Sequence, residues 1–218
     1  MTGEGLEHLE GLTLLANLYL WATGVKCDAL RHVGKLKSLR VLDVSGNRDL
    51  TDVDLKHLQG LASLEGLYIG GSQRLSGSGL WRLKGMAALH SLDLSQIGLT
   101  DDWLWRIGEL TSLEGLHMAC TGLKGTGLAE LRALGSLRKL NLSRTKLPGR
   151  ALEQLKGLLS LEVLDLSHVT GRITDADLLN LKELSRLGVL DLTGTRRLSS
   201  ALAAEFGRAL PEPEIRTA

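Results

Sequence analysis

Large aromatic side chains, proline and cysteine are all rare in this sequence. The 218 residues include four Trp, two Tyr, one Phe, three Pro and two Cys. So few rings disfavour the irregular core of one large globule and favour many small, similar layers. Two cysteines cannot supply the dense disulfide framework of a small secreted protein, which is typical of an intracellular chain. No apolar run approaches the roughly 18 residues that a membrane-spanning helix needs.

The sequence also has no large excess of positive or negative charge. The chain has 26 Lys and Arg against 25 Asp and Glu, a formal net charge of +1. It therefore lacks the basic excess of a nucleic-acid-binding protein and the polybasic cluster that binds anionic membranes. Residues 1–9 include Glu4, Glu7 and His8 and have no uninterrupted apolar stretch, so they do not form a signal peptide. We predict a cytoplasmic protein with no nucleic-acid and no membrane partner.

Leucine is abundant, with 53 copies, and it recurs at a fixed period. The pattern Leu-x-x-Leu-x-Leu-x-x-(Thr/Asn) returns eight times at spacings of 24 to 26 residues. A period in this range is the sequence signature of a solenoid, in which each repeat packs only against its neighbours. The first leucines of the eight copies are Leu15, Leu39, Leu64, Leu89, Leu113, Leu137, Leu161 and Leu187.

One repeat, residues 39–61, shows what each copy should form. Leu42 and Val44 alternate with polar or smaller neighbours, which predicts a short strand with one buried face. Thr51 and Asp52 then form a helix N-cap pair ahead of leucines spaced by three, which predicts about two turns of helix. Neither element can bury its apolar side alone, so stacking of copies should provide the stability.

The repeats give a single domain with two different ends. We expect residues 1–14 to be a partial N-terminal repeat, 15–198 to be eight repeats, and 199–218 to be a C-terminal cap with one more short strand. Four strand spacings of about 4.8 Å would separate Cys27 and Cys120 by roughly 19 Å. That distance is too long for a disulfide, so both are predicted to be free thiols.

This pattern resembles the leucine-rich repeat family over essentially the whole chain, and most closely its 24-residue bacterial-type subtype. The resemblance implies an α/β solenoid, a right-handed curved horseshoe with a parallel sheet on its concave face. It also implies a ladder of buried Asn or Thr side chains that hydrogen-bond neighbouring backbone at the turns. Ile97 and Val169 occupy this position in the fourth and seventh repeats and cannot take part. Repeat seven has two extra residues near 170–172, where we expect a bulged loop.

The family's concave face is its usual binding surface, and it is the predicted site here. Tyr19, Trp21 and Tyr68 gather at the N-terminal end and are candidate interface anchors, or else they cover an incompletely capped end. Asp43, Asp93, Asp165 and Asp191 could meet a basic partner, or else serve only solvation and local hydrogen bonds. The remaining predicted contacts on this face are His117, Asn141, Arg144 and His168.

Tryptophans also recur on the predicted convex side. Trp81 and Trp105 fall at the same helical position of adjacent repeats, and Trp103 lies two residues away. If their rings point outward they form an apolar ridge, which would provide a second contact or a self-association surface. The alternative is that each indole lies flat over its own helix.

No residue set indicates catalysis. The glycine-rich stretch 70–79 lacks the Lys-Ser/Thr of a phosphate-binding loop and falls on a turn of repeat three. Asp93, His117 and Cys120 lack a fourth metal ligand, and Cys120 with His117 lacks the groups that would orient and activate a nucleophile. We predict no enzyme activity, no metal and no cofactor.

The predicted function is therefore a non-catalytic scaffold that binds a protein partner through its concave face. The alternative is the recognition segment of a larger adaptor, ligase substrate receptor or bacterial effector, because the partial repeat at residues 1–14 lacks its strand half.

Overall fold

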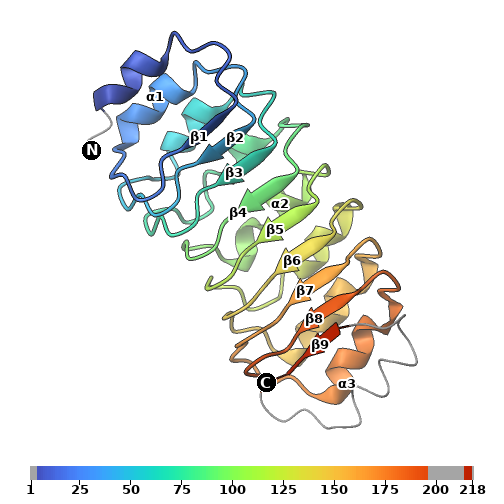
Figure 1. Cartoon of the computed structure of the whole chain (residues 1–218). Coiled ribbons are helices and arrows are strands. Elements are labelled where there is room, and N and C mark those ends of the chain that lie inside the picture. Colours follow the sequence, from blue (N-terminus) through green and yellow to red (C-terminus); the bar gives the residue numbers. More distant parts are fainter. Residues whose placement is uncertain (1–3, 196–213, 218) are drawn as a thin grey trace.

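The structure is a computed structural model that describes residues 4–195 and 214–217. Nine short strands form one parallel sheet in sequence order (Figure 1). Eight of them lie at the predicted positions, and the ninth is the strand expected near the C-terminus. The strands are β1 (Asn17–Tyr19), β2 (Val41–Asp43), β3 (Gly66–Tyr68), β4 (Ser91–Asp93), β5 (Gly115–His117), β6 (Lys139–Asn141), β7 (Val163–Asp165), β8 (Val189–Asp191) and β9 (Glu214–Arg216).

The described helical segments between the strands are mostly 3-10 helices, and the α-helices among them are short. Leu55 and Leu58 are three residues apart in the sequence, which matches the three residues per turn of a 3-10 helix. The 3-10 segments are η1 (Glu4–Leu9), η2 (Cys27–Ala29), η3 (Asp54–Leu58), η4 (Leu80–Leu83), η5 (Asp101–Trp103), η6 (Leu128–Ala133), η7 (Gly149–Gly157) and η8 (Leu179–Glu183). The α-helices are α1 (Leu30–Val33), α2 (Leu104–Gly108) and α3 (Asp175–Leu178).

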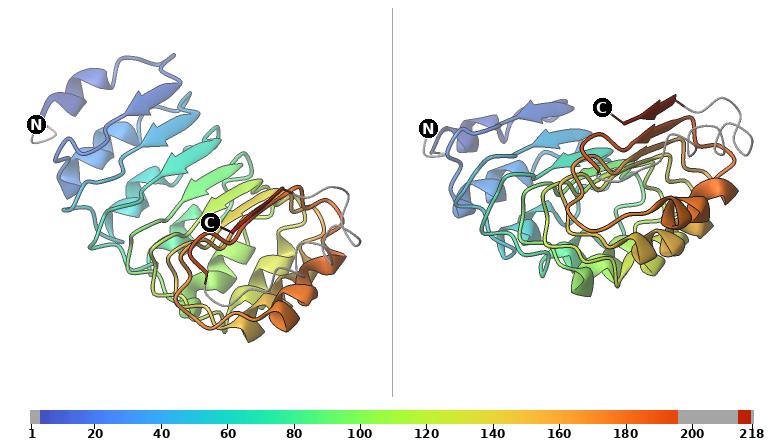
Figure 2. Two further views of the ribbon diagram at one scale, coloured as in Figure 1. Left: turned by 60° about the horizontal axis from the view of Figure 1, so that its bottom comes forward. Right: turned by 90° about the horizontal axis from the view of Figure 1, so that it is seen from below.

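The elements form two layers of a curved solenoid. Figure 2 shows the strands along the inner, concave side and the helical segments along the outer, convex side. This is the predicted right-handed horseshoe with its parallel sheet on the concave face.

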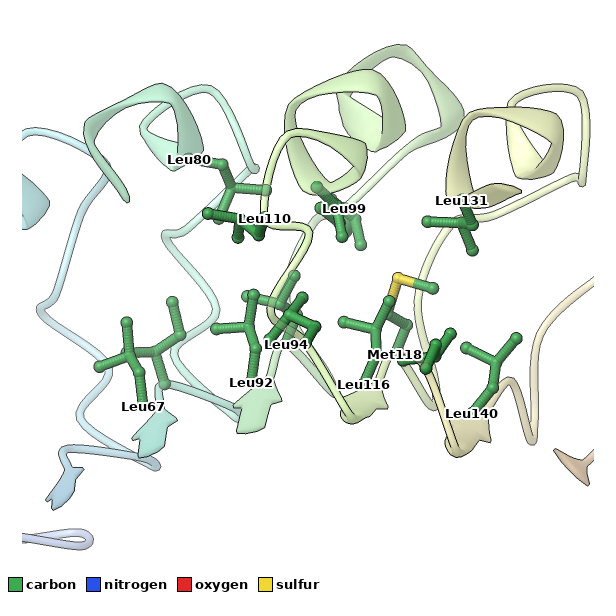
Figure 3. Packing of buried hydrophobic residues seen from close by; sticks show 14 of the residues in the cluster. Leu67, Leu80, Leu92, Leu94, Leu99, Leu110, Leu116, Met118, Leu131 and Leu140 are labelled. Atoms are coloured by element: carbon green, nitrogen blue, oxygen red, sulfur yellow. The ribbon is translucent and has the colours of Figure 1, made fainter. Parts of the chain in front are cut away.

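The core lies between the two layers and is almost entirely leucine. Leu67, Leu92, Leu116 and Leu140 are direct register partners on successive strands, and each is at most 1% exposed (Figure 3). Full burial of one such side chain stabilises the fold by roughly 1.5–3 kcal/mol. Since each leucine is covered by the repeats on either side, that stabilisation depends on stacking.

The first repeat is covered on one side only. Leu18 and Leu20 are half-buried, whereas their equivalents in β2, Leu42 and Val44, are fully buried. Segment η1 covers part of this end, because Leu6 is buried and Leu9 packs against the core. At the other end β9 pairs with β8, while Ser199, Leu202, Phe206 and Leu210 of the predicted cap lie outside the described residues.

In each of the eight repeats, the turn that follows the strand contains a residue with positive φ. The sequence did not reveal this feature. The eight residues lie two positions after the second buried strand residue, with φ between 51° and 71°. Three are glycines, which adopt this conformation without steric cost, and the other five are not. The eight residues are Ala22, Gly46, Gly71, Gln96, Cys120, Arg144, His168 and Gly194.

The expected ladder of polar side chains at the next position is present at one residue. Asn47 is fully buried, accepts a hydrogen bond from the Val25 N–H (2.9 Å), and donates to the carbonyl oxygens of Leu20 and Val44 (2.8 Å each). It therefore joins two repeats. The threonines donate only to a carbonyl of their own turn, three residues earlier, because their side chains are shorter.

Three other copies make no such bond in the described part of the chain. Ile97 and Val169 are buried apolar side chains, as the sequence indicated, and the buried Ser72 hydroxyl has no partner. The polar side chains implied by the resemblance therefore bond backbone at Asn47 and at the threonines, but they join two repeats only at Asn47 among the described residues.

Two aspartates of the predicted helix starts cap the following repeat instead of their own. The Asp52 carboxylate accepts hydrogen bonds from the backbone N–H groups of Ser76 (2.9 Å) and Gly79 (2.8 Å). Asp101 likewise accepts from the Lys124 N–H (2.7 Å). Among the predicted helix starts in residues 4–195, only Thr174 forms the expected cap of its own helix, through a reciprocal pair of hydrogen bonds with Asp177.

We expect Asn47→Ala to lower the free energy of unfolding by about 3 kcal/mol, because it leaves several buried backbone groups unpaired. Thr145→Val removes one hydrogen bond within a turn and should cost about 1 kcal/mol. Urea unfolding followed by circular dichroism measures both. Equal losses for the two variants would contradict the role of Asn47 in joining repeats.

We expect Gln96→Gly to raise the free energy of unfolding by about 1 kcal/mol, because glycine removes the cost of the left-handed conformation. Gln96→Ala is the control and should change stability little, since alanine already occupies this position at Ala22. The same urea titration applies. A glycine variant less stable than the alanine variant would show that the conformation is not strained.

Candidate protein-binding face

The concave face consists of three rows of side chains that run across the sheet. The central row contains every predicted strand-centre residue, because the strands pair in register. Its members are Tyr19, Asp43, Tyr68, Asp93, His117, Asn141, Asp165, Asp191 and Arg216. One flanking row begins at Asn17 and Val41, and the other begins at Trp21 and Ser45.

The acidic and amide residues of the central row accept hydrogen bonds from the turns that follow their own strands. Oδ1 of Asp93 accepts a hydrogen bond from the backbone N–H of Ser95, two residues later (2.8 Å). Asn141 makes the same bond to Ser143 (2.9 Å), and the other three aspartates of the row do so as well. The local hydrogen-bonding role considered for the aspartates is therefore present, and it needs a side-chain oxygen rather than a negative charge.

The aromatic residues of the face are concentrated at its N-terminal end. Tyr19 is 65% exposed and Trp21 is 68% exposed, so most of each side chain is accessible to solvent. Tyr68 is half-buried and folds back over Gly66 of its own strand. Trp21 is the only large side chain in its row, where the other members are Ser45, Gly70, Ser95, Ala119, Ser143, Ser167 and Thr193.

The residues next to these rings in the sheet are small. The Trp21 indole nitrogen lies 3.4 Å from the point that a Cβ on Gly46 would occupy. Gly70 is buried and lies next to the Asp93 carboxylate of the neighbouring strand. Neither glycine has a side chain that would occupy the space beside the rings.

At the C-terminal end of the face, charged side chains replace the aromatic rings. Arg216 in β9 donates a hydrogen bond to Glu214 (2.8 Å) and lies 3.9 Å from Asp191. Glu214, through this hydrogen bond, raises the pKa of the Arg216 guanidinium, and Arg216 lowers the pKa of Glu214. Arg144 and His168, also predicted for this face, lie instead at the left-handed turn positions where the strands end.

The convex tryptophans have different environments. Trp81 and Trp105 are each 44% exposed, and each ring is partly covered by the arginine that follows it, at 4.4 Å for Arg82 and 3.5 Å for Arg106. Trp103 is half-buried and packs against the core. A convex contact surface at these residues stays a prediction.

The structure offers little for catalysis in the part of the chain that it describes. No three His, Cys, Asp or Glu side chains there are placed to hold a metal ion. Cys120 is a free, exposed thiol as predicted, and the side chain of Cys27 lies outside the description. Within the same residues, no helix has the length and apolar character needed to cross a membrane.

Comparison with known proteins identifies the fold. No family model and no curated protein matches the chain. Among solved structures, internalin C2 from Listeria monocytogenes superposes with a TM-score of 0.72 at 20% identity, covering 100% of this chain and 84% of that one. An internalin F from the same species gives a TM-score of 0.58 at 17% identity, over 96% and 69%. The predicted leucine-rich-repeat solenoid is thereby confirmed as the fold of this chain.

We expect Asp93→Asn to leave the free energy of unfolding within about 0.5 kcal/mol of the parent, because an amide oxygen accepts the same hydrogen bond at Asn141. Asp93→Ala should cost about 1 kcal/mol, since the Ser95 N–H loses its acceptor. Thermal and urea unfolding measure both. Equal destabilisation by Asn and Ala would show that the charge, rather than the hydrogen bond, stabilises the turn.

Proposed function

We propose that this chain is a non-catalytic scaffold that binds a protein partner through its concave strand face. The supporting observation is the pair of exposed rings, Tyr19 and Trp21, which lie next to glycine and other small residues of the sheet. Exposed tyrosine and tryptophan are the side chains that most often supply binding energy at protein interfaces.

The size of the face suits a protein rather than a small molecule. Nine strands at about 4.8 Å spacing span roughly 38 Å, enough for a standard interface of about 800 Å² per partner.

The side chains also indicate what kind of partner surface fits. At the N-terminal end, Tyr19, Trp21 and Tyr68 would contact an apolar or aromatic segment. Farther along, the second carboxylate oxygen of Asp165 would meet a lysine or arginine side chain. A partner with an apolar patch next to a basic patch has this complementarity.

We expect the double substitution Trp21→Ala with Tyr68→Ala to weaken binding of the protein partner by at least about 2 kcal/mol, the scale of aromatic hot-spot residues. The partner would first be isolated by affinity purification with the intact chain, and affinity then measured by calorimetry.

The matched control is Trp81→Ala, which removes a similar ring from the convex side. It should leave the affinity unchanged, and circular dichroism should show that both variants remain folded. Unchanged affinity in the concave variant, or an equal loss in the convex one, would contradict the proposed binding face.

A further inference from the structure

A cavity opens at the turns of the sixth, seventh and eighth repeats, beyond the ends of their strands. Its volume is about 740 Å³, within the range of roughly 300–1,000 Å³ that is usual for ligand sites. Its lining includes Arg144 from repeat six, His168 and Arg172 from repeat seven, and Gly194 from repeat eight. The cavity lies at the edge of the molecule, apart from the aromatic end of the concave face.

The two extra residues of repeat seven build one wall of this cavity. Residues 170–172 take the place of the single residue Lys146 in the repeat before. The loop is held at both ends, because the Thr170 N–H donates to the Thr145 carbonyl (3.0 Å) and the Gly149 N–H donates to the Arg172 carbonyl (2.9 Å). The predicted bulge is therefore a fixed loop, pinned to the preceding repeat.

Two glycines allow the walls to come together. A Cβ on Gly171 would overlap the Leu147 carbonyl oxygen, so only glycine fits where the loop meets the preceding repeat. A Cβ on Gly194 would overlap the imidazole of His168, which lies across the neighbouring turn. A larger residue at position 171 would push the loop away from the backbone of the preceding repeat, and one at position 194 would displace the His168 side chain.

No described acidic side chain pairs with the two arginines that line the cavity. Within the described residues, the guanidinium groups of Arg144 and Arg172 form no ion pair and no hydrogen bond. Elsewhere, exposed arginines pair readily, as Arg138 does with Glu162 at 2.7 Å. The acidic residues of the adjacent strands, Asp165 and Asp191, accept hydrogen bonds from their own turns and do not line the cavity.

We propose that this cavity binds a phosphate monoester group, with Arg144 and Arg172 supplying the charge and His168 a further hydrogen bond. Guanidinium groups match the oxygens of phosphate in geometry as well as in charge. A dianion neutralises two permanent positive charges, whereas a carboxylate neutralises only one. The group could belong to a phosphorylated protein side chain or to a small phosphate ester, and these two sources share the same chemistry.

Calorimetric titration of the intact chain with inorganic phosphate at low ionic strength tests the proposal. We expect saturable 1:1 binding with a dissociation constant of roughly 1 mM or lower. The double variant Arg144→Gln with Arg172→Gln should bind at least about tenfold more weakly. Arg150→Gln, which removes one positive charge from an exposed position in η7 outside the cavity, should bind within about twofold of the parent.

Further titrations identify the source of the phosphate and can overturn the assignment. A phosphoserine peptide that binds more tightly than inorganic phosphate would support a phosphorylated protein, and equal affinity would support a small ester. No saturable phosphate binding, an equal loss in the Arg150 variant, or acetate bound as tightly as phosphate would each overturn the proposal. None of these results depends on the concave face, so this site and the proposed scaffold function are tested separately.

Discussion

Each repeat of this chain buries its leucines only against the repeats before and after it. The strands are three residues long and the helical segments span one or a few turns, so neither element is stable alone. In-register parallel pairing places equivalent side chains such as Leu92 and Leu116 directly side by side, and the outer layer closes over them. The rest of the structure follows from this stacking, including the rows of exposed residues on the concave face.

Stacking of apolar residues is supplemented by a few polar side chains that reach from one repeat to another. Asn47 bonds to the repeat before it, while Asp52 and Asp101 cap backbone groups of the repeat after them. These bonds are unevenly distributed, since the equivalent positions at Ile97 and Val169 are apolar. Local stability should therefore differ along the solenoid even though the leucine pattern is nearly uniform.

The two proposed binding regions arise from departures from the repeat. The aromatic end of the concave face exists because Trp21 occupies a position where later repeats carry small residues, and because Tyr19 and Tyr68 lie in a row whose other members are polar or charged. The phosphate cavity exists because an insertion brings Arg172 to the turns that carry Arg144 and His168. The regular positions of the repeat build the scaffold, and the irregular ones give it chemically distinct surfaces.

The sequence by itself determined the architecture, because the leucine period reports directly which side chains must face a shared core. It located all eight strands of the repeats, placed the central row from Tyr19 to Asp191 on one face, and marked the insertion near 170–172. It also indicated that Ile97 and Val169 could not join a polar ladder, because their side chains have no hydrogen-bonding group.

Only the tertiary structure decided which polar side chain bonds to which repeat, because those partners are 22 to 27 residues apart. Asp52 looked like a cap for its own helix, yet it caps the next repeat, and the threonines proved too short to bridge turns. The residue with left-handed backbone in each turn could not be recognised from the sequence, since five of the eight are not glycine. The cavity was not evident from the sequence either, because Arg144 lines it together with His168 and Arg172 only when the turns of repeats six and seven are stacked.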